Sequence, residues 1–394
     1  MDDILYPGLL DDKPISISFN QDFSLFSIAT ENGFKIYNTS YLYHQYEKNL
    51  CGGLSKCELS YKSNYLALVG GGKIPIFNNK KVVLYNDSED CIESEYKFTT
   101  PVLNVKLKKN LLFVVCEKKI YVFNIENSQN IDCFDTIINK KGLIAINGKP
   151  DKTIIAYPIE FNDESEKGYV SIKNYKTNKC FPQYVQDDTI SYMAMDYEGL
   201  LLATSNEKGT IIRIHNCKDG TLLQECKRGK EKAEIFYICF DIDYKYVGVS
   251  SDRKTIHIWK LDNIIETKEK DKSVSSKSII NKEIASSSIY SHKKCMSAIN
   301  FYGNEEKSEI KIRDIKKYKT ATSFGKIRMN EPYCIFCFKP KGIVIIFSLN
   351  GNCYKAFIDK KGGDCIIYGE RNLKNLKEKI DTNTEKEKTI ENKI

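Results

Sequence analysis

Apolar and polar positions along the chain recur in a fixed order. An aromatic or apolar residue leads into a turn of Asp, Asn, Gly or Lys, and a strand of small and aliphatic residues, a second polar turn and a second strand follow. Short apolar runs bounded by such turns are typical of strands rather than helices. The order is clearest at residues 19–40, 105–127, 195–220, 240–262 and 338–362, and weaker copies occupy 65–87 and 153–175.

The spacing of these copies predicts the fold class. The inner turn of each copy is marked by Gly33, Lys80, Lys118, Gly168, Gly209, Lys254 and Gly351. The first five gaps are 47, 38, 50, 41 and 45 residues, and the last is 97. A period of roughly 40–45 residues with four strands per repeat is the signature of a β-propeller. Seven copies therefore predict an all-β, seven-bladed propeller of four-stranded WD-like blades. A pair of β-sandwiches is the alternative, but it would not require an equal period.

The long last gap indicates an insertion in the sixth repeat. Residues 262–316 are rich in Ser and Lys, with scattered apolar residues, and residues 370–394 are almost entirely charged or polar. We expect one propeller over 1–369 that carries 262–316 as a long loop of blade six, followed by a disordered tail at 370–394.

Composition narrows the class of protein. The chain has 394 residues, of which 41% are hydrophobic, and it contains no apolar run of about 18 residues, so we expect no transmembrane helix. The acidic start, interrupted by Pro7, does not resemble a signal peptide. We therefore expect a cytoplasmic protein whose 14 cysteines are reduced and serve as small core residues. The net charge of +8 permits attraction to an anionic membrane or nucleic acid.

Two cysteines have the spacing of a possible metal site. Cys334 and Cys337 form a C-x-x-C. Residues three apart in a strand point to opposite faces, and no second pair with zinc-finger spacing follows. We expect no metal site there.

A basic turn separates the fifth and sixth repeats. Residues 222–236 read LLQECKRGKEKAEIF, which places Lys227, Arg228 and Gly229 between two strand-like segments. Neighbouring side chains of an extended segment point to opposite sides, so Lys227 can face blade five while Arg228 faces blade six. One dipeptide would then serve two anion pockets, and Gly229 would allow a tight turn or close approach of a phosphate. The alternative is an ordinary surface turn.

At this turn the sequence resembles the PROPPIN family of β-propellers. The family hallmark Phe/Leu-Arg-Arg-Gly stands here as Cys226-Lys227-Arg228-Gly229, flanked by LATSNEKGTIIRIHNCKDGTLLQ and VGVSSDRKTIHIW. VGGGKIPIFNNKKVVLYND and NGNCYKAFIDKKG also resemble family segments, and the likeness covers roughly residues 10–368.

The resemblance implies a peripheral membrane protein of autophagy or related membrane trafficking and organelle biogenesis. Its ligands would be phosphatidylinositol 3-phosphate and phosphatidylinositol 3,5-bisphosphate, bound in two headgroup pockets on blades five and six. The protein would lie on preautophagosomal, endosomal or vacuolar membranes. A lipid-transfer protein of autophagy would bind blades two and three, with the stretch Asn78–Lys81 as the contact. We expect a monomer in solution that binds no nucleic acid.

Polar side chains near the basic turn supply the two candidate pockets. The first pocket combines Lys227 with Thr204, Ser205, Asn206, Thr210 and Arg213. The second combines Arg228 with Ser250, Ser251, Thr255 and His257. Hydroxyls and amides donate to phosphate oxygens, and arginine does so with two N–H groups at once. Free histidine is half-protonated near pH 6.5, so we expect His257 to add charge in acidic conditions. Taken singly, each of these residues is also common in turns or cores.

Two departures from the family pattern affect the first pocket. Lys227 replaces an arginine and loses the planar fork of donors. Gln186 stands where many relatives have histidine. We expect the first pocket to bind more weakly than the second.

The insertion resembles the long blade-six loop with which the family contacts the bilayer. Lys293 and Lys294 would lie at headgroup level. The apolar face would comprise Ile279, Ile280, Ile284, Ile289, Tyr290, Met296, Ile299, Phe301 and Tyr302. The alternative is a passive low-complexity insert.

No catalytic motif is evident. The sequence lacks a P-loop and a G-x-S-x-G, and its four histidines, His44, His215, His257 and His292, form no H-x-x-x-H pair. We expect neither an enzyme nor a cofactor. The leading alternative function is a WD-repeat scaffold that binds only proteins. A basic propeller that binds nucleic acid ranks third and would show a steep salt dependence.

Overall fold

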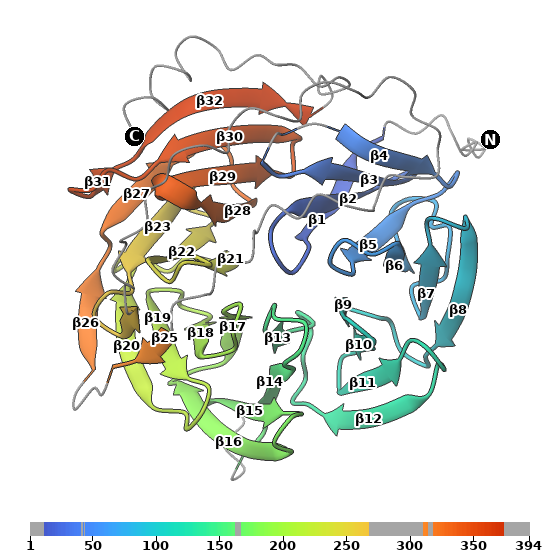
Figure 1. Ribbon diagram of the computed structural model, residues 1–394, viewed down its shortest axis with the longest axis horizontal. Coiled ribbons are helices and arrows are strands. Elements are labelled where there is room, and N and C mark those ends of the chain that lie inside the picture. Colours follow the sequence, from blue (N-terminus) through green and yellow to red (C-terminus); the bar gives the residue numbers. More distant parts are fainter. Residues whose placement is uncertain are drawn as a thin grey trace, which may run out of the picture.

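The computed structural model shows a ring of seven four-stranded blades around a central channel (Figure 1). It describes residues 12–40, 42, 44–161, 167–267, 310–313 and 318–373. The predicted all-β, seven-bladed propeller is confirmed. The only helical element among the described residues is the short 3₁₀ helix η1 (Pro340–Gly342).

The first four blades each use four consecutive strands, ordered from the channel outward along the chain. Blade one contains β1 (Pro14–Phe19), β2 (Leu25–Thr30), β3 (Gly33–Asn38) and β4 (His44–Asn49). Blade two contains β5 (Leu54–Leu59), β6 (Tyr65–Gly70), β7 (Lys81–Asn86) and β8 (Cys91–Lys97). Blade three contains β9 (Asn104–Lys108), β10 (Leu111–Val115), β11 (Lys119–Asn124) and β12 (Asn130–Asp135). Blade four contains β13 (Ala145–Ile146), β14 (Ile154–Ile159), β15 (Gly168–Asn174) and β16 (Lys179–Gln186).

Of the last three blades, the fifth and the sixth each carry an additional strand, and the seventh has four strands. Blade five contains β17 (Ile190–Met195), β18 (Leu201–Asn206), β19 (Ile211–Asn216) and β20 (Leu222–Lys227), with β26 (Lys319–Thr322) as an added edge. Blade six contains β21 (Ile235–Phe240), β22 (Tyr246–Ser251), β23 (Thr255–Lys260) and β27 (Gly325–Arg328), with β31 (Gly363–Asp364) at its edge. Blade seven contains β28 (Cys334–Lys339), β29 (Ile343–Ser348), β30 (Asn352–Phe357) and β32 (Ile366–Asn372).

The repeat predicted from sequence corresponds to the turn between the second and third strand of each blade. Gly209 shows why glycine recurs there: its φ is +59°, and a Cβ would lie 2.1 Å from the carbonyl oxygen of Ala233. An L-residue with a side chain rarely adopts that conformation, and here it would also clash with backbone.

Hydrophobic packing between neighbouring blades holds the ring together. The middle strands are apolar on both faces because each blade packs against two neighbours; every residue of β2 and β18 is buried. Seven buried clusters result, one at each junction. The ring closes between blades one and seven without strand exchange, where the rings of Phe26 and Phe347 lie 4.0 Å apart between centroids.

The cysteines contribute to these clusters. All thirteen that the structure describes are unpaired, and most are buried. Cys334 packs in the cluster between blades six and seven, whereas Cys337 packs in the cluster between blades seven and one. The two side chains therefore point to opposite faces of β28, as predicted.

The insertion begins and ends in an ordered ladder. β24 (Ile265–Thr267) pairs antiparallel with β25 (Ile310–Ile312), so Thr267 and Ile310 face each other. Ile264 and Ile265 are buried in the cluster between blades five and six. At the other boundary, β32 continues to Asn372 and Leu373 is buried, so blade seven extends beyond the expected limit at 369.

One buried histidine makes the stability of the fold sensitive to acid. His215 of β19 is 2% exposed, and its Nδ1 has no partner among the described residues. Burial, together with the charge of Arg213, lowers its pKa to about 3. The unfolded chain, with a histidine pKa of about 6.5, therefore binds a proton that the folded chain excludes between these values.

We predict a loss of stability as the pH falls from 7.5 to 5.0, of which His215 accounts for about 2 kcal/mol. Urea unfolding followed by the fluorescence of Trp259, the single tryptophan, measures it. The His215→Gln variant should lose about 2 kcal/mol less than the wild type over the same interval. An equal loss in both proteins would contradict the assignment.

Candidate functional site

The basic turn separates one exposed cation from one buried cation. Lys227 ends β20 and is exposed, and its ammonium has no hydrogen bond or ion pair with any described residue. Arg228 is 9% exposed, and its backbone N–H donates to the carbonyl of Thr210 at 2.8 Å. The two neighbours thus enter different surroundings, as strand geometry predicts.

Backbone carbonyls hold the Arg228 guanidinium. Its Nε donates to the carbonyl of Gly209 at 2.6 Å, and a terminal nitrogen donates to the carbonyl of Glu231. Burial lowers the pKa of Arg228, with a further lowering from Arg253, while Asp252 opposes it. Arginine has five N–H donors, so these two bonds leave three for another acceptor.

Gly229 is not required by the turn itself. Its φ is not positive, and a Cβ there would meet no atom within 4 Å. The turn therefore does not depend on the conformational freedom of glycine. Open space beside the residue remains compatible with close approach of a ligand.

The small polar residues predicted for the first pocket are buried and already bonded. The hydroxyl of Thr204 accepts a hydrogen bond from Nε2 of Gln186 at 3.0 Å. The hydroxyl of Ser205 lies 2.8 Å from that of Ser191. Oδ1 of Asn206 accepts from the N–H of Gly209 at 3.1 Å. These side chains fasten the end of blade five, and only Thr210 of the small polar set is part-exposed.

Arg213 is neutralised by two carboxylates. Its terminal nitrogen lies 2.5 Å from Asp187, and its Nε lies 3.0 Å from Glu225. Although burial works in the opposite direction, the hydrogen bonds that Arg213 donates to Asp187 and Glu225 raise its pKa above the ordinary arginine value. In this structure the arginine predicted for phosphate binding is held by acidic groups.

The hydroxyls predicted for the second pocket line the end of blade six. Ser250 donates to the carbonyl of Cys334 at 2.6 Å, and Thr255 donates to the carbonyl of Arg253 at 3.3 Å. The hydroxyl of Ser251 accepts from the N–H of Arg253 at 3.4 Å. Ser250 and Ser251 are buried, whereas Thr255 is part-exposed.

His257 is neutral rather than poised to gain charge. It is 7% exposed and stacks on Trp259 with ring centroids 5.9 Å apart. Burial, together with the charges of Arg228, Lys326 and Arg328, lowers its pKa to about 4. The expected gain of charge near pH 6.5 is therefore corrected for the unliganded protein.

Three further cations, which the sequence did not predict, surround the second pocket. Lys326 and Arg328 of β27 pair with His257 and Thr255 of β23, and Arg253 follows Ser251 in the adjoining turn. β27 follows the insertion, so nothing in the local sequence indicates that it completes blade six. The alternation of cations in Lys326-Ile327-Arg328 was the available signal, because residues two apart share a strand face.

The second pocket contains fewer acidic groups than basic groups. Arg328 lies 3.3 Å from Asp364, and Arg253 lies 3.7 Å from Glu231. Both pairs are largely exposed and therefore contribute little to stability. The second pocket thus retains an excess of positive charge, unlike the surroundings of Arg213.

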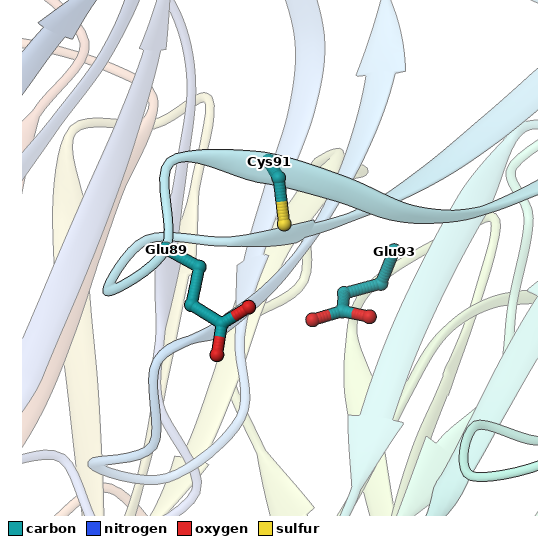
Figure 2. A group of neighbouring side chains, drawn as sticks. All are labelled: Glu89, Cys91 and Glu93. Atoms are coloured by element: carbon teal, nitrogen blue, oxygen red, sulfur yellow. The ribbon is translucent and has the colours of Figure 1, made fainter.

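A separate acidic group lies on the outer edge of blade two. The side-chain ligand atoms of Glu89, Cys91 and Glu93 lie within 4.8 Å of one another, and the three side chains point toward a common region (Figure 2). Partial burial and both glutamates raise the pKa of the Cys91 thiol, which favours the protonated form. Glu93 also accepts a hydrogen bond from Asn86 at 2.8 Å. The group has no further feature of a metal site.

The described residues include no helix that is long and apolar enough to cross a bilayer. The insertion residues predicted to enter the bilayer, from Ile279 to Tyr302, lie outside the described part of the chain.

Comparison with known proteins identifies the family. Residues 15–373 match the model of the PROPPIN family. The chain belongs to the PROPPIN family. The hallmark turn, the seven blades and the boundary at Leu373 agree with this match.

Curated relatives of this PROPPIN include proteins named autophagy-related protein 18. It is 33% identical over 259 residues to autophagy-related protein 18e of Arabidopsis thaliana, a match that covers 63% of this chain and 66% of the relative. It is 29% identical over 257 residues to autophagy-related protein 18 of Dictyostelium discoideum, a match that covers 65% of this chain and 67% of the relative. These matches span about two thirds of the length of the relatives.

Solved structures share the fold. Kluyveromyces lactis Hsv2 superposes with a TM-score of 0.68 at 16% identity, covering 92% of this chain and 100% of that chain. KlAtg21, solved in complex with the coiled-coil of AgAtg16, superposes with a TM-score of 0.65 at 18% identity, and the match covers 91% of this chain and 99% of that chain.

We predict that His257 stays neutral in the free protein down to about pH 5, because charging it would cost both desolvation and repulsion from three cations. Two-dimensional NMR of the imidazole signals against pH should give an apparent pKa near 4 for His257. The His257→Gln variant identifies its signal. A midpoint near 6.5 would show that the ring is solvated and would contradict the burial.

Proposed function

We propose that this PROPPIN binds phosphoinositides and docks on membranes that carry them, in autophagy or related membrane trafficking. The observation that carries the proposal is the second pocket: Arg228 is held by neutral carbonyls beside Arg253, Lys326 and Arg328, with His257 and Thr255 on the adjoining strand. A dianionic phosphate would be bound there by charge-assisted hydrogen bonds. Family membership supplies the class of ligand.

Phosphatidylinositol 3-phosphate and phosphatidylinositol 3,5-bisphosphate are the proposed lipids. Both carry a phosphate that the spare N–H groups of Arg228 can bind. Thr255, at the start of β23, would contribute its hydroxyl to the same pocket. At the proposed first pocket, Lys227 supplies a cation that has no partner among the described residues, and Thr210 supplies a part-exposed hydroxyl. A WD-repeat scaffold without lipid binding is the competing function.

Membrane residence would combine the pockets with the insertion. Linked weak contacts raise overall affinity without any single strong site. The insertion leaves blade six at β24 and returns at β25, on the part of the ring that carries both pockets. We propose that the propeller stands edge-on, with the residues between these strands toward the bilayer.

A protein partner is proposed at blades two and three. Asn78, Asn79 and Lys80 form an exposed turn before β7. The carbonyl groups of Lys80 and Asn79 accept backbone hydrogen bonds from the N–H groups of Phe98 and Val102, which fix the turn. A rigid exposed turn is suited to recognition. A lipid-transfer protein of autophagy is the proposed partner, as the family resemblance implies.

The first experiment replaces both cations of the turn. Lys227→Thr with Arg228→Thr should abolish binding to liposomes that contain phosphatidylinositol 3-phosphate, because losing a buried hydrogen-bonded charge typically costs roughly 2–5 kcal/mol in a complex. Liposome flotation measures it. The control, Lys230→Thr with Lys232→Thr, removes the same charge from the same turn and should retain most of the binding.

Three outcomes would argue against the proposal. A folded Lys227/Arg228 double variant that still binds would exclude the turn as the site. Equal loss in the control pair would reduce the effect to general charge attraction. Wild-type protein that binds equally well to liposomes with and without the 3-phosphate would exclude specific recognition of the headgroup.

A second experiment replaces the insertion. Because Thr267 and Ile310 pair across β24 and β25, a short Gly-Ser linker can join them without disturbing blade six. We predict unchanged affinity for soluble headgroup but weaker binding to liposomes. Burial of one large apolar side chain contributes roughly 1.5–3 kcal/mol, so losing several would outweigh one polar contact. Unchanged liposome affinity would make the insert passive.

A further inference from the structure

The two proposed pockets differ in what holds their arginine. Arg228 is held by carbonyl groups, which satisfy N–H donors but carry no net charge. Arg213 is held by the carboxylates of Asp187 and Glu225. An anion that approaches Arg213 therefore meets two negative charges of the protein beside one guanidinium.

The two carboxylates are not equally accessible. The side chain of Asp187 is 66% exposed and that of Glu225 is 12% exposed. Asp187 also accepts a hydrogen bond from the hydroxyl of Tyr184, and the hydrogen bond from Arg213 holds its pKa below the usual range. Asp187 is thus an ionised group on the open side of Arg213, where a ligand phosphate would have to lie.

Glu225 is fixed from the opposite side by the strand that follows the insertion. Thr320 of β26 pairs with Glu225 in the parallel ladder to β20, and its hydroxyl lies 3.3 Å from Glu225 Oε2. This buried carboxylate is fastened at both oxygens, by Arg213 and by Thr320. The exposed Asp187 is the group that a ligand can displace.

We infer that Asp187 acts as an internal anionic competitor for the first pocket, so that a headgroup phosphate binds Arg213 only by displacing it. This inference rests on the proposed function, because it concerns one of the two pockets. It assigns the weakness of the first pocket to a residue of the connection between blades four and five rather than to Lys227 or Gln186. The consequence is that the second pocket binds first.

The structure offers a matched control at the next residue. Asp188 is also acidic, but it lies 3.8 Å from Lys208 and makes no contact with Arg213 among the described residues. Removing its charge changes the net charge of the protein by the same amount as removing that of Asp187. Any difference between the two variants therefore reports the contact with Arg213.

The test is calorimetric titration with soluble inositol 1,3-bisphosphate at fixed salt. Asp187→Asn preserves the shape and an acceptor oxygen for Tyr184 while it removes the charge. We expect the weaker of two sites to tighten about threefold to tenfold, the effect of removing one part-exposed charge beside an anion. Asp188→Asn should change it by less than about twofold, since its charge lies with Lys208.

A double variant decides whether Arg213 mediates the effect. Asp187→Asn with Arg213→Gln should lose the gain and leave only the tight site, because no guanidinium remains to be released. If both single variants tighten binding equally, the effect is general electrostatics and the inference fails. If the wild type binds tightly and Asp187→Asn leaves both sites unchanged, the inference fails while the proposed function stands. If the wild type binds no headgroup, both fail.

Discussion

Burial of the middle strands on both faces is the constraint on which this structure depends. A sheet that is apolar on both sides cannot be stable alone, so each blade requires a neighbour on either side, and a ring is the arrangement that gives every blade two. The ring closes by contact between Phe26 and Phe347 rather than by a shared strand. Accessible polar side chains are thereby concentrated at the channel, the turns and the outer edges of the blades.

The outer edges of blades five and six are completed by segments from the following blade. β26 leaves blade six to cover β20, and β31 leaves blade seven to cover β27 (Figure 1). An uncovered strand edge exposes unpaired N–H and C=O groups, and these additions cover part of it. They also bring Thr320 to Glu225 and Asp364 to Arg328. Edge protection and the composition of the two pockets therefore have a common structural origin.

The sequence predicted what depends on local periodicity. Turn residues such as Gly209 and Lys254, and apolar runs such as that of β18, repeat with the blades and identified both the fold and the place of the basic turn. Cross-strand and cross-blade relations were not predictable. The insertion separates β27 from β23, so Lys326 and Arg328 gave no sign that they flank His257, and the neutral state of that ring follows from burial. Asp187 looked like an ordinary loop residue because its contact with Arg213 depends on how blades four and five pack.

The acceptor that holds an arginine decides whether the arginine remains available to a ligand. A backbone carbonyl orients the guanidinium and leaves its positive charge uncompensated, as at Arg228. A carboxylate orients it equally well but cancels that charge, as at Arg213. Because the attraction of a phosphate depends on the net local charge, two arginines on adjoining blades can be equally well ordered and still differ in affinity. In a propeller that also contacts a membrane through other elements, such an inequality would fix the order in which the contacts form.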